Sequence, residues 1–189
     1  MSVPPFIAYL LIVNTLGLLF PLVNKYAKKG FFDIITAIIA ALGGSVGAIL
    51  GIIFFDRKST KENMLSRILI ICLFIIQAVI LLYVKGKHQE GFNFNIIAFF
   101  KEHFFFFCYL ILINIMATVS FGLDKFYAVK EKSRIPIILL IGIAFMGGTL
   151  GAIAGMYLFR HKTQKSYFNV GLRVILITQL VVLLYIMNI

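Results

Sequence analysis

The chain has few charged residues and lacks Trp altogether. Only 13% of its 189 residues are Asp, Glu, Lys or Arg, whereas 61% are hydrophobic, and the mean hydropathy is +1.02. A soluble domain cannot build a polar shell from this composition. Without Trp, the 20 Phe and 8 Tyr must provide the interfacial anchoring of a membrane protein. The composition predicts an all-α integral membrane protein.

Cysteine and acidic residues are also scarce. Cys72 and Cys108 both lie in apolar runs, without the spacing of a disulfide framework or a Cys/His metal site, so we expect no metal and no cofactor. The 18 Lys and Arg outnumber 7 Asp and Glu, which gives a net charge of +11. These cations are spread over short loops, which argues against nucleic acid as a partner and favours anionic lipid headgroups or anionic solutes.

Six apolar stretches have about the 20 residues that a helix needs to cross a membrane. The first shows no basic segment before it and no cleavage site after it, so we interpret it as a retained span. Residues 85–103 contain a short aromatic stretch that we interpret as a connector with an interfacial helix. The predicted domains are a first three-helix repeat at 1–84, this connector, and a second three-helix repeat at 104–189. The six stretches are 4–23, 31–55, 66–84, 104–123, 135–159 and 168–188.

The two halves of the chain resemble each other at matching positions. Asn14, Gly47 and Gln77 recur as Asn114, Gly151 and Gln179, at offsets of 100, 104 and 102 residues. The pattern indicates an internal, tandem duplication. Three crossings per copy would turn the second copy upside down, so the sequence predicts two three-helix inverted repeats. With that topology the cations are nearly balanced between the two sides, and the orientation in the membrane stays open.

Glycines spaced four residues apart mark the second and fifth spans. Residues with this spacing share one helix face and allow another helix to approach closely, so we expect these two spans to pack against each other in a glycine zipper. Alternatively, the paired glycines break the helix at mid-membrane and free carbonyl groups that line a solute site. The helix-packing candidates are Gly43, Gly44, Gly47, Gly51, Gly147, Gly148, Gly151 and Gly155.

Polar amides inside the spans require an explanation. Asn14, Asn114, Gln77 and Gln179 are costly in hydrocarbon unless they are paired, so each should face the interior of the helix bundle. Hydrogen bonding between helices and contact with a solute are both open interpretations. We count all four as candidate solute-binding residues.

A basic cluster ends the fifth span. Arg160, His161, Lys162 and Thr163 can anchor the helix end at the headgroups, or they can bind an anion. These four residues are further solute-binding candidates.

The second half resembles the small bacterial membrane proteins of the family called domain of unknown function 1294. The similarity covers roughly residues 107 to 185 and implies a three-helix membrane unit without an established activity. The matching residues are Asp124-Lys125, Ala128, Arg134-Ile135-Pro136, Gly147-Gly148, Gly151, Gly155-Met156, Phe159 to Thr163, Lys165 and Phe168.

One departure from the family pattern suggests a composite site. The family has Glu where this chain has Ile137, and Ile137 corresponds to Asp33 in the first half. The first half therefore keeps the acid, but it has Arg57-Lys58-Ser59 in place of the His-Lys-Thr cluster. In the inverted arrangement Asp33 and the Arg160 cluster would meet on one side, so Asp33 is also a solute-binding candidate.

These features favour a small channel or transporter for a small ion or solute in the bacterial plasma membrane. The alternative is a non-transporting membrane protein that binds anionic lipid headgroups or a partner helix. We expect no enzyme, because the sequence has no Ser-His-Asp set, no paired carboxylates and no catalytic residues that we can name.

Overall fold

The computed structural model describes residues 4–27, 31–57, 60–86, 93–131 and 133–189, and these residues form helices and connecting turns without a strand. The chain divides into two compact units, Met1–Val84 and Lys85–Ile189. Six helical segments among the described residues are long and apolar enough to cross a membrane, judged by length and composition. The predicted all-helical, membrane-type character is confirmed.

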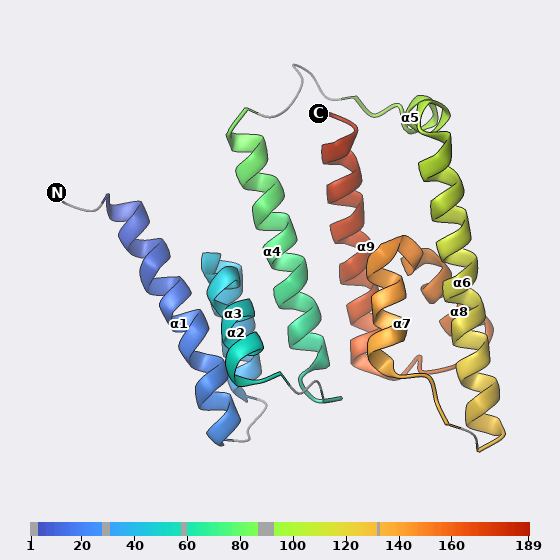
Figure 1. Cartoon of the computed structure of the whole chain (residues 1–189), viewed down its shortest axis with the longest axis horizontal. Helices are drawn as coiled ribbons and strands as arrows, with labels where there is room; N and C mark the ends of the chain where they lie inside the picture. Colours follow the sequence, from blue (N-terminus) through green and yellow to red (C-terminus); the bar gives the residue numbers. More distant parts are fainter. Residues whose placement is uncertain (1–3, 28–30, 58–59, 87–92, 132) are drawn as a thin grey trace. The chain divides into compact units, whose positions relative to one another are not determined.

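Unit 1 contains two long helices and a broken one between them (Figure 1). The first helix begins at Pro5, where proline is favoured because the first helical residue needs no hydrogen-bonded N–H. The elements are α1 (Pro5–Ala27), α2 (Phe31–Ile39), the π-helical turn η1 (Ala40–Gly44), α3 (Ser45–Phe55) and α4 (Met64–Val84).

Unit 2 has the same order of elements after one short additional helix. The side chain of Asn95 caps that helix by accepting a hydrogen bond from the Ala98 amide. The elements are α5 (Ile96–Glu102), α6 (Phe104–Val129), α7 (Ile137–Ile143), the π-helical turn η2 (Ala144–Gly148), α8 (Thr149–Leu158) and α9 (Ser166–Ile186).

The middle helix of each unit is broken at a glycine with a left-handed backbone. Gly43 has φ 105° and Gly147 has φ 108°, and the next residues, Gly44 and Gly148, also depart from the α-helix with ψ of 19° and 18°. A side chain at such a φ would be strained, which explains why glycine stands at the break. The alternative prediction that the paired glycines break the helix is therefore confirmed.

In unit 2 the break reverses the direction of the chain. The Asp124 side chain, near the end of α6, accepts a hydrogen bond from the Ile135 amide before α7 and contacts His161 and Lys162 after α8. A straight helix from residue 135 to residue 161 would be about 39 Å long, so one side chain could not reach both ends. The segment α7–η2–α8 is a re-entrant helical hairpin, and both of its ends lie at the same end of α6.

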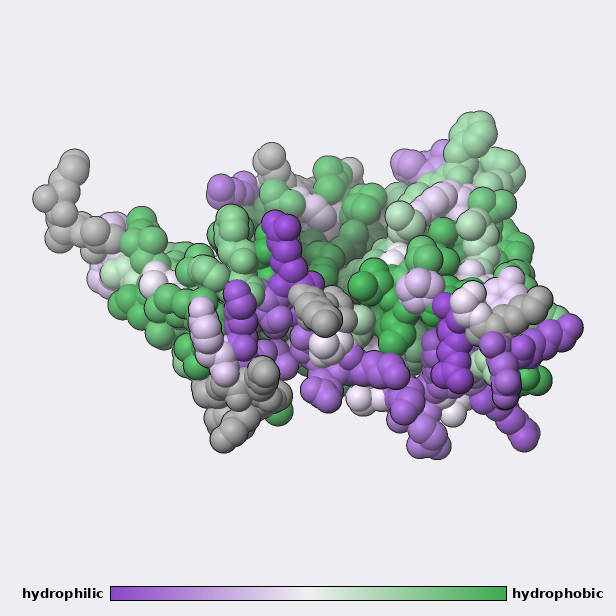
Figure 2. Space-filling view, turned by 60° about the horizontal axis from the view of Figure 1, so that its bottom comes forward, coloured by the Kyte–Doolittle hydropathy of each residue, from purple (hydrophilic) through white to green (hydrophobic). Residues whose placement is uncertain are grey.

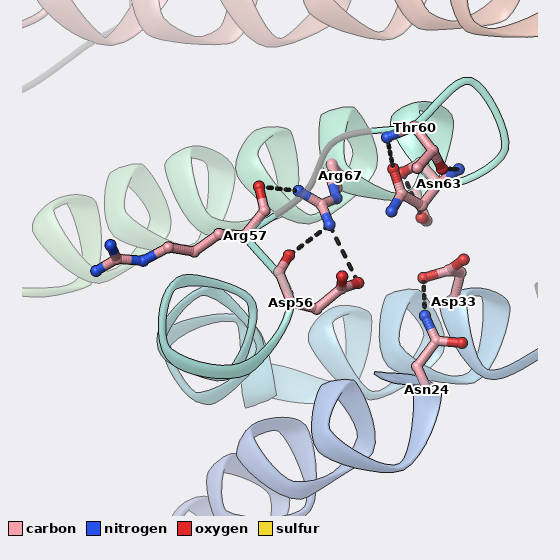
Figure 3. Close-up of polar contacts among 8 residues, drawn as sticks. Asn24, Asp33, Asp56, Arg57, Thr60, Asn63 and Arg67 are labelled. Carbon is pink, nitrogen blue, oxygen red and sulfur yellow. Dashed lines mark hydrogen bonds and ion pairs between the residues drawn. The ribbon is translucent and has the colours of Figure 1, made fainter. Parts of the chain in front are cut away.

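Unit 1 contains the same hairpin. Asn24, near the end of α1, contacts Asp33 in the first turn of α2, while Gly51 of α3 lies against Leu18 and Pro21 of α1. Figure 3 shows Asp33 and Asp56, from opposite ends of the segment α2–η1–α3, at the same end of the unit. The 11 residues of α3 span only about 17 Å, which is short of the roughly 30 Å thickness of the hydrocarbon.

The hairpins change the predicted topology. The prediction of three crossings per repeat is wrong, because the middle segment returns to the side from which it enters. Two unbroken helices in each unit, α1 and α4 or α6 and α9, are then the candidates for a complete crossing. An even number of crossings returns the chain to its starting side, so the premise for inverted repeats no longer holds.

The glycine stripes pack within their own units. A Cβ atom on Gly47 would overlap the main chain of Asn14 in α1, and one on Gly151 would overlap the main chain of Asn114 in α6. The expected contact between the second and fifth spans through these stripes is therefore wrong. The glycines allow each hairpin to lie directly against the first long helix of its own unit.

Large hydrophobic side chains are exposed along the helices, for example Leu11 at 60% and Leu112 at 60%. Within each unit, Figure 2 shows hydrophobic side chains over the helix sides and hydrophilic side chains gathered at a helix end. A bilayer accounts for this distribution, since lipid tails cover apolar surface that water would not.

Candidate functional site

The tip of each hairpin leaves carbonyl groups without their usual helical partners. In unit 1, the Gln77 amide on α4 donates hydrogen bonds to the carbonyl oxygens of Ala40 at 2.7 Å and Ala41 at 3.4 Å. In unit 2, the Gln179 amide on α9 donates to those of Ala144 at 2.7 Å and Phe145 at 3.3 Å.

The next two carbonyl groups of the unit 1 tip are satisfied by α1. The Tyr9 hydroxyl donates to the Leu42 carbonyl at 2.7 Å, and the Asn14 amide donates to the Gly43 carbonyl at 3.1 Å. Four consecutive carbonyl groups, from residue 40 to residue 43, thus accept side-chain hydrogen bonds.

Unit 2 repeats this arrangement on α6. The Tyr109 hydroxyl donates to the Met146 carbonyl at 2.7 Å, and the Asn114 amide donates to the Gly147 carbonyl at 3.0 Å. The carbonyl groups of residues 144 to 147 all accept side-chain hydrogen bonds as well. Unpaired carbonyl groups would be costly at this depth, so these bonds make the break possible.

The oxygen atoms of the same amides bind the start of the returning helix. The Asn14 side-chain oxygen accepts from the Gly47 amide at 2.8 Å, and that of Asn114 accepts from the Gly151 amide at 2.6 Å. The Gln77 oxygen accepts from the Ser45 hydroxyl, and the Thr149 hydroxyl lies 2.8 Å from both the Gln179 oxygen and the Ala144 carbonyl oxygen, either of which can accept its single proton. Each amide therefore uses both of its polar atoms to hold the hairpin tip.

The intramembrane amides have two interpretations, hydrogen bonding between helices and contact with a solute. All four amides join helices by hydrogen bonds, which is the structural interpretation. A direct role in solute binding stays a prediction, and it would require a solute to compete with bonds of 2.6 to 3.1 Å.

An ion cluster closes the base of the unit 2 hairpin. Asp124 is fully buried, and its Oδ2 atom lies 2.6 Å from Lys162 Nζ and 2.8 Å from His161 Nε2. The Lys162 ammonium also lies 5.1 Å from the centre of the Phe168 ring, and Phe168 packs edge-to-face on Phe121. The carboxylate thus joins α6 to both ends of the hairpin.

The turn that carries this cluster has a strained backbone. Arg160 and Lys162 are non-glycine residues with positive φ, at 46° and 61°. Each costs about 1 kcal/mol or more and persists only where the surroundings impose it. The Arg160 side chain is exposed, and Thr163 is half-buried in the same turn. The bonds to Asp124 provide a physical reason for the conformation of Lys162.

Different polar contacts hold the base of the unit 1 hairpin (Figure 3). The Asn24 amide donates to Asp33 Oδ1 at 2.7 Å. Arg67 on α4 forms an ion pair with Asp56 at 3.1 Å, and it also donates to the main-chain carbonyls of Asp56 and Arg57. Arg67 therefore ties the end of the hairpin to the start of α4.

The predicted composite site combines residues of both units. Asp33 has Asn24 as its partner in unit 1, and His161 and Lys162 have Asp124 in unit 2. The pairing of Asp33 with the Arg160 cluster stays a prediction. Lys58 and Ser59, the unit 1 counterparts in that comparison, lie outside the described residues.

Asp124 and the two tyrosines were missed as site residues. Asp124 directly follows the fourth apolar stretch and lies in the motif Asp124-Lys125, so its burial near a basic cluster could have been suspected. Tyr9 and Tyr109 recur at the same offset of 100 residues as the two asparagines, which was the available signal.

No group of His, Cys, Asp and Glu side chains suited to a metal ion occurs in the described part of the chain. The site consists of hydrogen bonds and ion pairs that shape two hairpins. It contains no arrangement of a nucleophile and a base among these contacts.

Comparison with known proteins places the chain in a family. Residues 114–168 match the family described as "Protein of unknown function (DUF1294)". The chain is also similar to "Uncharacterized protein YsdA" of Bacillus subtilis (strain 168), with 37% identity over 75 residues, which are 40% of this chain and 84% of that protein. The chain belongs to the DUF1294 family. No solved structure gives a significant match.

The family match covers the hairpin of unit 2 and part of its contacts, while Tyr109 and Gln179 lie outside the matched range. It starts at Asn114, which holds the hairpin tip, and ends at Phe168, which packs beside Lys162. The whole re-entrant hairpin and its acidic partner on α6 lie inside the matched range.

Proposed function

We propose that this DUF1294 protein is a small channel or transporter that moves a small ion or solute across the bacterial plasma membrane. One observation carries the proposal: each unit contains a helical hairpin whose arms are each shorter than the hydrocarbon thickness of a membrane. Irregular backbone inside a membrane is tolerated where it is buried in protein or lines a water-filled cavity. Broken helices of this kind form the solute sites of many transporters.

We further propose that the two units arose by tandem duplication. Supporting this, the tip of each hairpin is held by one Tyr, one Asn and one Gln at matching positions, with the same atoms bonded. Duplicated units are common in membrane transporters. The inverted arrangement is not part of this proposal, because each unit has an even number of crossings.

The charge around the hairpin bases favours anions as the transported ions. Exposed cations there, such as Arg160 and Lys165, raise the local concentration of anions. The carboxylates of Asp56 and Asp124 are each paired with a cation of their own unit. Chloride is therefore expected to move faster than potassium.

The purified protein reconstituted in sealed liposomes tests this function. We expect chloride efflux above that of protein-free liposomes, and slower efflux from the Gly147→Ala variant, which strains the hairpin turn. Gly142→Ala is the matched control, because a Cβ there meets no neighbouring atom within 4 Å and its φ is not positive. Folded protein that passes none of chloride, potassium and glycerol would overturn the proposal and favour the non-transporting alternative.

A further inference from the structure

The re-entrant hairpins redistribute the positive charge of each unit. In unit 1, both ends of the hairpin, the end of α1 and the start of α4 lie together, as the bonds of Asp33 and Arg67 show. The described cations at this end are Lys25, Arg57, Lys61 and Arg67, whereas the described residues of unit 1 at the opposite end, near the start of α1 and the end of α4, include no Lys or Arg, and Lys85 follows as the first residue of unit 2.

Unit 2 shows the same segregation. Asp124 joins the end of α6 to both ends of the hairpin. At the opposite end, Asn188, after α9, bonds to the main chain of Asn93, ahead of α5. The hairpin end carries Lys125, Lys130, Arg134, Arg160, Lys162 and Lys165, whereas Lys101 in the last turn of α5 is the described cation at the opposite end.

The near-balance of cations expected from the sequence therefore came from treating each hairpin as a crossing. With the hairpins re-entrant, each unit taken by itself has a cationic end and an end with at most one or two cations among the residues that the structure describes. Short loops rich in Lys and Arg stay in the cytoplasm. Applied separately to the two units, this rule gives the same result for both.

We propose that the hairpin end of each unit faces the cytoplasm and binds anionic phospholipid headgroups of that leaflet. Each Lys or Arg near such a surface contributes about 1 kcal/mol of attraction. Lys130, Arg134, Arg160 and Lys165 are exposed in the turns beside the hairpin of unit 2, where phosphate groups can reach them. The hairpins then enter the membrane from the cytoplasm.

Labelling of single cysteines tests the orientation. In a Cys72→Ala/Cys108→Ala background, Lys61→Cys, Lys130→Cys and Lys101→Cys are exposed to a membrane-impermeant maleimide added to intact bacteria. We expect Lys101→Cys to react, and the other two to react only after the cells are permeabilised. Reaction of Lys61→Cys or Lys130→Cys in intact cells would overturn the orientation of the corresponding unit.

The lipids that stay bound during purification test the proposed contact with anionic headgroups. Protein purified from nanodiscs of equal phosphatidylglycerol and phosphatidylcholine is analysed by mass spectrometry. We expect at least twofold enrichment of phosphatidylglycerol, lost in Lys130→Gln/Arg134→Gln/Lys165→Gln and kept in the control Lys85→Gln/Lys101→Gln. Equal retention of both lipids by the wild type, or enrichment unchanged in the triple variant, would overturn the headgroup contact whatever the orientation or transport activity.

Discussion

The two hairpins share their tips and differ at their bases. At the tips, the same three residue types bond the same four carbonyl groups in both units. At the bases, unit 2 uses a buried ion cluster around Asp124, whereas unit 1 uses an amide–acid hydrogen bond and a separate Asp56–Arg67 pair. We attribute this difference to the depths that we expect for the tips and the bases in the membrane. An unpaired carbonyl in hydrocarbon has no substitute partner, while a group near the headgroups can find water or another side chain.

The largest effect is expected where a hairpin touches its long helix. Gly151→Leu places a side chain in the main chain of Asn114 and should cost at least about 3 kcal/mol, enough to prevent folding of the unit. Gly47→Leu should do the same against Asn14. The amount of monodisperse protein in detergent is the measurement, with Gly142→Ala as the control. Normal yield of either Leu variant would show that the contact is not close.

Removing the acidic side chain should destabilise the base of the unit 2 hairpin more than the base of the unit 1 hairpin. Asp124→Ala leaves Lys162 and His161 without their carboxylate and is expected to cost about 3 kcal/mol, as the loss of one partner from a buried ion pair does. Asp33→Ala removes one hydrogen bond to Asn24 and should cost about 1 kcal/mol. Thermal unfolding in detergent, followed by circular dichroism, compares the two. Equal losses would contradict the distinction between the bases.

Removing the glutamine side chain should destabilise the two hairpin tips by similar amounts. Gln179→Leu and Gln77→Leu each remove two hydrogen bonds to carbonyl groups of a hairpin tip and are expected to cost about 2 kcal/mol. Because the two sites belong to separate units, the double variant should lose the sum of the single losses. The same unfolding assay applies. A large effect in one unit only would show that the matching bonds are not equivalent.

The smallest effect is expected at the turn residue itself. Gly147→Ala and Gly43→Ala keep the bonds but force a side chain into a left-handed backbone, at about 1 kcal/mol each. Gly142→Ala, in an ordinary helical position, should be neutral or slightly stabilising. Both turn variants are compared with this control by their unfolding midpoints. If either substitution stabilised the protein, the glycine at that turn could not have a positive φ.

The sequence predicted the apolar segments and the matching polar residues, but not how the middle segment runs. Composition and length describe a 23-residue apolar segment such as Asp33–Phe55 equally well whether it is straight or folded. Its path is decided by one left-handed glycine and by donors from distant helices, such as Gln77 and Tyr9. Asp124 was overlooked for a related reason: its partners lie 37 and 38 residues away in the chain, and the hairpin alone brings them together.

The central claim, that the middle segment of each unit returns to its own side, can be tested in unit 2. Ser133→Cys lies before α7 and Gln164→Cys lies after α8, and both residues are exposed. In the Cys72→Ala/Cys108→Ala background, both cysteines should react with an impermeant maleimide under the same condition, either both in intact cells or both only after permeabilisation. Reaction of one in intact cells and of the other only after permeabilisation would show that the segment crosses the membrane and would contradict the hairpin.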